Sequence, residues 1–334
     1  MMTLTLPATA RMGHSLEMVQ RAVTMGEDTI ILPLNFTCNS RCRFCIIETE
    51  IDARFADTQN EVFEQVFAYN ARARQFSRLT LSGAESTLHP ALPDIAAAAT
   101  TRGGFSTVRI QTNARRLRDR ALTERLVASG ITEYFVSIHA HTDALDSHIT
   151  RSQRSFSQMR DGVQNLLDIG ARVLSNTVIS ADNAPHLDAI ADFILGLGIR
   201  ELQFWSFLEI GEAAQQADQL VPLDIATPAL CAALDRVDQA GATAVVKWIP
   251  RCVLGHHGDK LDNHQPPMLM RDEFQDRLSD NFGFDCVHAN RCRWFGRGCD
   301  GLHASYRRVY GTEDARLKPS PLLPGMAPMP RGPR

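Results

Sequence analysis

The chain has 334 residues, a length that predicts one large domain or one domain with a smaller appendage. Hydrophobic residues make up 44% and charged residues 22%, which is typical of a folded globular protein and excludes disordered or collagen-like classes. Lysine and arginine (35) nearly balance aspartate and glutamate (38), so we expect neither nucleic acid nor a membrane as a partner. The sequence shows no transmembrane stretch and no secretory signal, so we expect a cytoplasmic protein.

From residue 28 onward, short β-rich segments alternate with segments of helical periodicity. We expect six strands, at residues 29–36, 78–82, 107–112, 133–138, 172–179 and 201–207. We expect helices between them, at residues 58–76, 91–102, 119–129, 155–169 and 184–196. Serial βα units predict a parallel sheet with helices on its outer face. The predicted fold class is therefore α/β, with a partial (β/α)6 TIM-like barrel over residues 28–210 that follows an N-terminal extension at 1–27.

The regular alternation stops after residue 210. A helix is expected at 224–240 and a strand at 244–249, followed by loop-rich sequence that contains four cysteines. We interpret residues 211–316 as a smaller cysteine-rich C-terminal domain. Residues 317–334 contain six prolines, which disfavour regular structure, and are expected to form a disordered tail.

Three of the eight cysteines are closely spaced in the loop after the first expected strand. Cys38, Cys42 and Cys45 have three and then two residues between them. Because cytosolic thiols stay reduced, metal ligation is a better interpretation than disulfides. Three thiolates bind three irons of a [4Fe–4S] cluster and leave the fourth iron open, whereas zinc requires four ligands and remains the alternative. The trio follows a strand, where the active sites of parallel barrels lie.

The segment CNSRCRFC, which includes Phe44 before the last cysteine, resembles the CxxxCxxC signature of the radical S-adenosylmethionine (radical SAM) family. SGAESTLHP after the second strand is similar to that family's GGEP-type motif, with Ala84 and Ser86 in place of the commoner Gly and Pro. IQTN, VSIHA and ITR further along the chain also resemble family positions. Together these motifs extend over residues 30–207.

This resemblance implies a set of cofactor contacts. Cys38, Cys42 and Cys45 would hold a [4Fe–4S] cluster whose open iron is chelated by the amino and carboxylate groups of S-adenosyl-L-methionine. Glu85 would accept a hydrogen bond from the ammonium group of this cofactor, although a solvated loop carboxylate is the alternative. The backbone of Phe44 would contact adenine.

Four further residues are candidates for cofactor contacts, each with a simpler structural alternative. By resemblance, Ser137 would reach the ribose or the carboxylate, unless it only bonds to backbone, and Arg151 would bind the carboxylate, unless it pairs with Asp146. Asn113 and Asn176 lie near strand ends, where they could contact ribose, but Asn is also a common turn residue.

Two histidines follow the fourth expected strand. His139 and His141 are our candidate catalytic residues, which would position substrate or move a proton, although a buried structural histidine is commoner. An arginine-rich run begins in the third expected strand and continues beyond it. We expect it to be a solvated face and assign it no role; its members are Arg109, Arg115, Arg116, Arg118 and Arg120.

The second cysteine group lies in the C-terminal part of the chain. Cys252, Cys286, Cys292 and Cys299 would fill every iron of a second [4Fe–4S] cluster, with a zinc site of four thiolate ligands as the alternative. The segment resembles the SPASM or Twitch auxiliary-cluster extensions of radical SAM enzymes. Cys231, in the helix expected at 224–240, is interpreted as a small buried hydrophobe.

The resemblance implies a radical SAM oxidoreductase or maturase that cleaves S-adenosylmethionine to a 5′-deoxyadenosyl radical and removes hydrogen from a substrate. Oxidation or crosslinking of a peptide is the preferred interpretation, and a sugar, amino-sugar or other small metabolite is the alternative substrate. About 28 residues precede the first strand, so we expect no leader-peptide-binding domain there. The electron donor would be a protein such as flavodoxin or ferredoxin. The alternative to an enzyme is a non-catalytic iron–sulfur or zinc protein.

Overall fold

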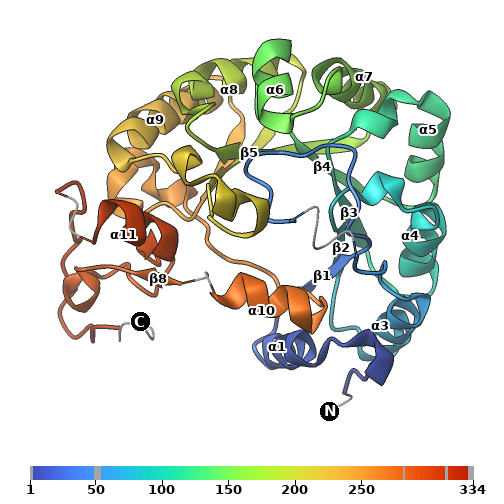
Figure 1. Cartoon of the computed structure of the whole chain (residues 1–334). Helices are drawn as coiled ribbons and strands as arrows, with labels where there is room; N and C mark the ends of the chain where they lie inside the picture. Colours follow the sequence, from blue (N-terminus) through green and yellow to red (C-terminus); the bar gives the residue numbers. More distant parts are fainter. Residues whose placement is uncertain (1–2, 49–53, 281–282, 313–314, 330–334) are drawn as a thin grey trace.

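Seven parallel strands form the centre of the structure, which is a computed structural model that describes residues 3–48, 54–280, 283–312 and 315–329 (Figure 1). The strands are β1 (Thr29–Pro33), β2 (Arg78–Ser82), β3 (Thr107–Thr112), β4 (Glu133–Ser137), β5 (Arg172–Ile179), β6 (Glu201–Ser206) and β7 (Thr243–Lys247). They are hydrogen-bonded in chain order, and every neighbouring pair is parallel. The predicted α/β class with a partial TIM-like barrel is therefore confirmed.

The sheet has one strand more than the six we expected. β7 pairs in parallel with β6, from Glu201 opposite Thr243 to Trp205 opposite Lys247. Helix α9 (Leu223–Gln239) forms the crossover connection between β6 and β7, as the earlier helices do between the earlier parallel strands. The expected strand at 244–249 is thus part of the barrel sheet, and the main hydrophobic core continues past residue 210.

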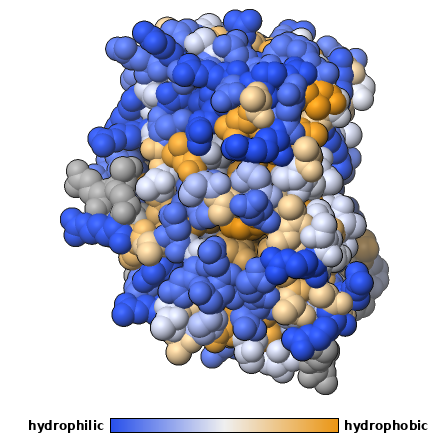
Figure 2. Space-filling view, turned by 90° about the vertical axis from the view of Figure 1, so that its right-hand side faces the viewer, coloured by the Kyte–Doolittle hydropathy of each residue, from blue (hydrophilic) through white to orange (hydrophobic). Residues whose placement is uncertain are grey.

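The other helices that cover the sheet form an arc around it in Figure 1. They are α3 (Asn60–Ala73), α4 (Leu92–Thr101), α5 (Arg120–Ala128), α6 (Asp143–Thr150), α7 (Ser155–Asp168) and α8 (Leu187–Gly196). Figure 2 looks onto the side that carries α4 and α5, and shows a mainly hydrophilic surface with apolar residues in scattered places. The apolar helix faces therefore point to the sheet. Among the described residues, no helix is long and apolar enough to cross a membrane.

Residues alternate between two environments along each strand. Leu81, Val108 and Ile110 face the helices and are fully buried in the main core. Arg78 and Arg109, which alternate with them, belong to the inner face of the barrel. The inner face is therefore much more polar than the outer one.

The segment 261–269 crosses the gap between the two edge strands. At one end the backbone N–H of Asp262 donates to the carbonyl of Val246 in β7 (3.0 Å). At the other end the N–H of Ile31 in β1 donates to the carbonyl of Pro267 (3.0 Å), and the N–H of Leu269 donates to the carbonyl of Ile31 (2.9 Å). This bridging segment joins β7 to β1 without forming a strand.

Two helices, α1 (Gly13–Thr24) and α10 (Asp272–Asp280), lie side by side at the open side of the arc (Figure 1). The backbone N–H groups of Gly13 and His14 donate to the carboxylate of Asp272 (3.0 and 2.9 Å). A carboxylate at this position satisfies free N–H groups at a helix N-terminus. The N-terminal extension is therefore attached to α10.

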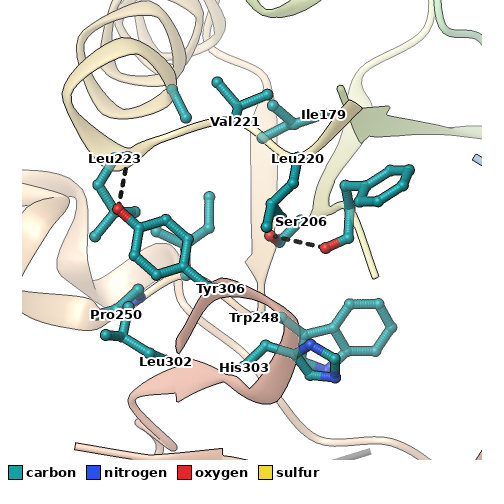
Figure 3. Close-up of a pocket in the computed structure, with 13 residues that line it drawn as sticks. Ile179, Ser206, Leu220, Val221, Leu223, Trp248, Pro250, Leu302, His303 and Tyr306 are labelled. Atoms are coloured by element: carbon teal, nitrogen blue, oxygen red, sulfur yellow. Dashed lines mark hydrogen bonds between the residues drawn. The ribbon is translucent and has the colours of Figure 1, made fainter. Parts of the chain in front are cut away.

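The C-terminal part packs onto the barrel through α11 (Ala304–Tyr310) and a hairpin of β8 (Phe284–Asp285) and β9 (Leu302–His303). Figure 3 shows the junction, where the hydroxyl of Tyr306 accepts a hydrogen bond from the backbone N–H of Leu223 (3.1 Å). The space between these elements measures about 20 Å³, which is too small for an organic ligand. The junction is therefore a packing contact.

The first part of the proline-rich segment is not free, which corrects our expectation of a disordered tail from residue 317. Leu317 is buried, and the carbonyl of Ser320 accepts a hydrogen bond from the N–H of Arg293 (2.9 Å). Pro321 forms a bridge with Cys292. Extended backbone suits proline, so a tail of this composition can pack without regular structure. Residues 330–334 of the expected tail lie outside the described residues.

A buried carboxylate in the barrel interior neutralises arginines from three other strands. Glu133 of β4 is 2% exposed and accepts hydrogen bonds from Arg78 (2.9 Å), Arg109 (2.8 Å) and Arg172. Burial raises the pKa of Glu133, but the attraction of Arg109 and Arg78 outweighs it and holds this pKa below its usual value. The charge of Glu133 therefore stabilises the fold above the ordinary carboxyl pKa, and this contribution is lost as the pH falls through the lowered pKa.

We expect Glu133→Gln to lower the free energy of unfolding by about 3 kcal/mol at neutral pH, because it leaves three guanidinium groups around an uncharged amide. Urea unfolding followed by circular dichroism measures this change. Glu201→Gln is the matched control, since Glu201 is partly exposed and pairs with Arg172 alone, and should cost less than about 1 kcal/mol. Equal costs for the two variants would contradict this account of Glu133.

Candidate functional site

The three closely spaced cysteines line one cavity at the carboxyl ends of the strands. Cys38, Cys42 and Cys45 lie in the loop that follows β1, and the cavity that they share with residues from β2, β3 and β4 measures about 160 Å³. Backbone N–H groups point at two of the sulfurs: Ser40 donates to the Sγ of Cys38 and Ile47 to that of Cys45, both at 3.4 Å. Such N–H···S hydrogen bonds stabilise thiolate ligands.

One side of the cysteine loop is bound to the end of β3. The guanidinium of Arg115 donates to the carbonyl of Asn39 and to the hydroxyl of Ser40 (2.9 Å). The side-chain amide of Asn113 donates to the Oδ1 of Asn39 (2.7 Å) and contacts the Sγ of Cys38 at 3.8 Å. Two residues that follow β3 therefore fix the backbone around the first cysteine.

The other side of the loop is bound to α6 and to the chain beyond β5. The N–H groups of Arg41 and Arg43 donate to the last carbonyls of α6, those of Thr150 and Ile149 (3.0 Å each). The guanidinium of Arg43 pairs with Asp182 (3.0 Å) and with a second carboxylate, that of Asp218 (2.8 Å). Arg43 is only 17% exposed, so these charged hydrogen bonds are partly shielded from water.

Glu85, which follows β2, is 1% exposed and lines the cavity. Its carboxylate accepts hydrogen bonds from the backbone N–H and hydroxyl of Thr87, from the hydroxyl of Thr112 (2.6 Å) and from the backbone N–H of Asn113 (2.7 Å). This geometry excludes the solvated loop position that we considered for Glu85. The carboxylate is fixed at the cavity wall by residues from the ends of two strands.

Gly83 allows the loops after β1 and β2 to approach each other. It has φ of +129°, and a Cβ at this position would lie 2.5 Å from the carbonyl oxygen of Asn35. Beside it, the N–H of Ala84 donates to the carbonyl of Asn35 (2.9 Å), and the N–H of Glu85 donates to that of Thr37 (3.1 Å). Ala84 and Ser86 replace the commoner Gly and Pro of the motif, but the loop still holds Glu85 beside the cysteines.

His139 and Ser137 also line the cavity, as does Phe44, whose ring packs edge-on against the His139 imidazole with 4.3 Å between ring centroids. The Nδ1 of His139 accepts a hydrogen bond from the backbone N–H of Val178 (3.1 Å). Burial lowers the pKa of His139 to about 3, so the ring is neutral and its proton is assigned to Nε2. His139 therefore offers a hydrogen-bond donor and is poorly suited to carry a proton back and forth near neutral pH.

Three candidates from the sequence do not line this cavity. His141 packs against the ring of His186, with 5.3 Å between centroids. Arg151 forms an ion pair with Glu212 (3.0 Å), and not with Asp146 as the alternative had it. Asn176 is buried on β5 opposite Ser137, and its Nδ2 has no hydrogen-bond partner among the described residues. Their predicted roles remain untested.

Sequence reasoning did not select several other residues that line the cavity, among them Arg115, Asp146, Thr150 and Ser155. The hydroxyl of Ser155 donates to the carboxylate of Asp146 and lies 2.9 Å from that of Thr150. Burial raises the pKa of Asp146, partly opposed by Ser155. Arg115 lies two positions after Asn113, which the sequence analysis did select. This proximity could have distinguished Arg115 from the other arginines of the run, which we expected to face solvent. We expected no helix at α6, and of the other three only Thr150 lies in a segment that the sequence analysis quoted, ITR.

The metal-free chain disfavours ionised thiols in the cysteine loop. Burial, followed by repulsion from Glu85, raises the pKa of Cys38 to about 11. Burial and the neighbouring thiols of Cys45 and Cys38 raise the pKa of Cys42 well above its usual value. Cationic iron removes this repulsion, because thiol ligands lose their protons on binding a metal. The trio therefore fits a site that is completed by metal.

The four C-terminal cysteines also come together. Cys252, Cys286, Cys292 and Cys299 line one small cavity of about 20 Å³ between the β8–β9 hairpin and the start of the proline-rich segment. Backbone N–H groups of His288 and Arg251 donate to the sulfurs of Cys286 and Cys299, both at 3.4 Å. Burial raises the pKa of Cys299 to about 11. Cys231 lies apart, with its thiol 3.9 Å from the carbonyl of Leu254.

The spacing of the sulfurs bears on the choice between zinc and a cluster. Tetrahedral zinc with Zn–S bonds of about 2.3 Å brings its ligand sulfurs to about 3.8 Å from one another. Within the described residues, which include all eight cysteines, the group with three ligand atoms within 4.8 Å of one another is Asp235, His256 and His257. Neither cysteine group is this compact in the described structure.

Comparisons with known proteins agree with this geometry. The family model of the Radical SAM superfamily matches residues 32–194, which contain the cysteine trio, Glu85 and His139. This part of the chain belongs to the radical SAM superfamily. GTP 3',8-cyclase from Chlorobaculum tepidum is 30% identical over 164 residues, which cover 48% of this chain and 44% of the relative.

Solved structures show the same fold at low sequence identity. Streptococcus suis SuiB bound to precursor peptide SuiA has a TM-score of 0.56 and 12% identity, with 90% of this chain and 69% of that chain covered. SuiB bound to S-adenosylmethionine has a TM-score of 0.53 and 14% identity, with 69% and 53% covered. The chain thus spans 44% of GTP 3',8-cyclase and 53% to 69% of the two SuiB chains.

The buried, neutral His139 predicts a pH dependence of stability. Burial lowers the pKa of His139 from 6.5 to about 3 in the folded state. The neutral ring therefore makes its full contribution to the free energy of unfolding above pH 6.5, and this contribution is lost as the pH falls toward 3. Between about pH 7.5 and pH 5 this amounts to about 2 kcal/mol. Anaerobic urea unfolding measures this effect. Between these two pH values we expect the free energy of unfolding of His139→Gln, which keeps an acceptor for the N–H of Val178, to fall by about 2 kcal/mol less than that of the parent. An identical pH dependence in both proteins would contradict the buried position of His139.

Proposed function

We propose that this chain is a radical SAM enzyme that oxidises or crosslinks a peptide. The observation that carries the proposal is the convergence of Cys38, Cys42, Cys45, Glu85 and His139 on one cavity at the carboxyl ends of the strands. A redox sensor or structural protein would have no use for a fixed carboxylate and a buried imidazole beside the metal ligands. This argument also disfavours the non-catalytic interpretation.

In the proposed mechanism, the thiolates of Cys38, Cys42 and Cys45 would hold three irons of a [4Fe–4S] cluster, and the fourth iron would bind the amino and carboxylate groups of S-adenosylmethionine. Glu85 accepts a hydrogen bond from the ammonium, and its fixed position requires no reorganisation. When bound, this cofactor pair supplies a 5′-deoxyadenosyl radical for hydrogen abstraction, given an electron from a donor such as flavodoxin or ferredoxin. His139 and Phe44 exclude water from the cavity wall.

The similarity in fold to SuiB, which was solved with a precursor peptide, supports a peptide as substrate. The relative GTP 3',8-cyclase supports the second candidate, a small metabolite, because the reaction in its name is that of a nucleotide. The two candidates share the radical step and differ in what occupies the barrel.

The proposal includes a second cluster in the cysteine-rich part of the chain that follows β7. Four thiolates from Cys252, Cys286, Cys292 and Cys299 would ligate every iron of a [4Fe–4S] cluster, so no position would remain for substrate. A site of this kind fits an electron acceptor, which predicts net oxidation of the substrate. The proximity of the four cysteines to one another supports this assignment.

The variant Cys38→Ala with Cys42→Ala and Cys45→Ala should form no 5′-deoxyadenosine, because the cofactor then has no open iron to bind. Anaerobic incubation with S-adenosylmethionine and dithionite, followed by chromatography, measures this product. Cys231→Ala is the matched control, since its thiol belongs to neither group, and should form the product at the parent rate. Product formation by the triple variant at the parent rate would exclude the proposed function.

Metal analysis separates the two interpretations of the C-terminal cysteines. We expect about eight irons per reconstituted chain, and about four in the variant that lacks the N-terminal trio. Cys286→Ala with Cys292→Ala should keep formation of 5′-deoxyadenosine and lose oxidised product. Stoichiometric zinc without iron in the trio-deleted protein would contradict the second cluster and leave the radical SAM core unaffected.

A further inference from the structure

A second and larger cavity, of about 280 Å³, lies inside the barrel. Its wall consists of inner-face residues of six strands together with part of the bridging segment 261–269. Gln111 of β3 lines both this barrel cavity and the cysteine cavity, so the two are neighbours. A group bound in the barrel cavity is therefore adjacent to the proposed radical site.

Lys247, the last residue of β7, contributes a buried charge to the barrel cavity. It is 7% exposed, and its ammonium donates to the backbone carbonyl of His264, the one hydrogen bond that it makes to the described residues. Burial lowers its pKa, which Asp262 partly opposes. The carboxylate of Asp262 is exposed and accepts a hydrogen bond from the N–H of His264 (2.9 Å). Lys247 thus lacks the close carboxylate that a buried ammonium normally requires.

The arginines that line the same cavity leave an excess of positive charge. Arg78 and Arg109 both bind Glu133, and Arg172 shares this carboxylate with them. Arg172 also pairs with Glu201 and does not line the cavity, whereas Asp262 does. With Lys247 included, four cations therefore face three carboxylates, which leaves one positive charge in excess. The potential inside the barrel favours an anion.

Aromatic rings form the wall beside these charges. Phe135 and Trp205 lie with 5.8 Å between ring centroids, and the guanidinium of Arg109 lies 5.6 Å from the Phe135 ring. The ammonium of Lys247 lies 5.9 Å from the Trp205 ring. This arrangement suits a ligand with a flat apolar part next to a negative group.

We propose that the barrel cavity binds a carboxylate of the substrate, with Lys247 as its charged donor, Arg109 as the second cation, and Phe135 and Trp205 against the adjoining apolar part. The inference rests on the proposed function, because it takes the occupant of the barrel to be the substrate. Lysine, arginine and an aromatic wall recognise the same chemistry in a free aromatic acid and in the carboxylate of a peptide.

The test uses 4-fluorophenylacetate as the probe and fluorine NMR as the measurement, on anaerobic protein with its clusters reconstituted. We expect binding of this acid and at least tenfold weaker binding of the neutral 4-fluorophenylacetamide. Lys247→Met should weaken binding of the acid at least tenfold, because it removes a charged hydrogen bond. Lys260→Met is the control, since Lys260 pairs with Asp238 outside the cavity, and should bind as the parent does.

The Lys247 variants also report whether the fold is intact. Because Lys247→Met removes a buried charge, the melting temperature should stay the same or rise. Lys247→Gln, which keeps a donor without the charge, should show the same weakened binding. Equal binding of acid and amide, or unchanged binding in both Lys247 variants, would overturn the proposal, as would tighter binding of 4-fluorophenyl phosphate than of the carboxylate.

A second comparison identifies the source of the carboxylate. N-acetyl-4-fluorophenylalanine carries the carboxylate of a peptide end, and tighter binding of it than of 4-fluorophenylacetate would support a peptide. The reverse order would support a small acid, and either order is consistent with a carboxylate site. The binding measurements use neither S-adenosylmethionine nor reductant. Failure of this proposal is therefore distinguishable from failure of the radical chemistry, which 5′-deoxyadenosine formation reports.

Discussion

Two guanidinium groups determine where the cysteine loop lies, and the rest of the site depends on that position. Arg115 binds the loop beside Cys38, and Arg43 binds it to Asp182 and Asp218 on the opposite side of the cavity. Charged hydrogen bonds of this kind contribute about 1.5–3 kcal/mol each. They hold the cysteines above the strand ends before any metal arrives, which reduces the conformational entropy that is lost on cluster assembly.

The parallel sheet connects this loop to the remainder of the site. Because all seven strands run in the same direction, Glu85, Thr112 and Ser137 reach one edge from three different strands. The same geometry places charged side chains on the inner face below that edge. The cysteine cavity and the barrel cavity are thus neighbours, and Gln111 lines both.

Local patterns in the sequence predicted those parts of the structure that are determined by residues close together in the chain. Strand and helix periodicity located β1 to β6, and the spacing of the cysteines located their loop. Contacts that depend on helix orientation were not predictable in this way: Asp146 enters the cavity through α6, whereas Arg151, five residues later, turns toward Glu212. The inner-face charges were also missed, because one sequence does not show that Arg78, Arg109 and Arg172 converge on the same carboxylate.

The bridging segment 261–269 has a consequence for how other chains meet this protein. Edge strands with free backbone groups invite pairing with foreign strands, which leads to aggregation or to peptide capture by strand addition. Here Ile31 of β1 and Val246 of β7 already form backbone hydrogen bonds with the bridging segment. A peptide that added itself to either strand would have to displace these bonds, so recognition by side chains inside the barrel is the less costly route.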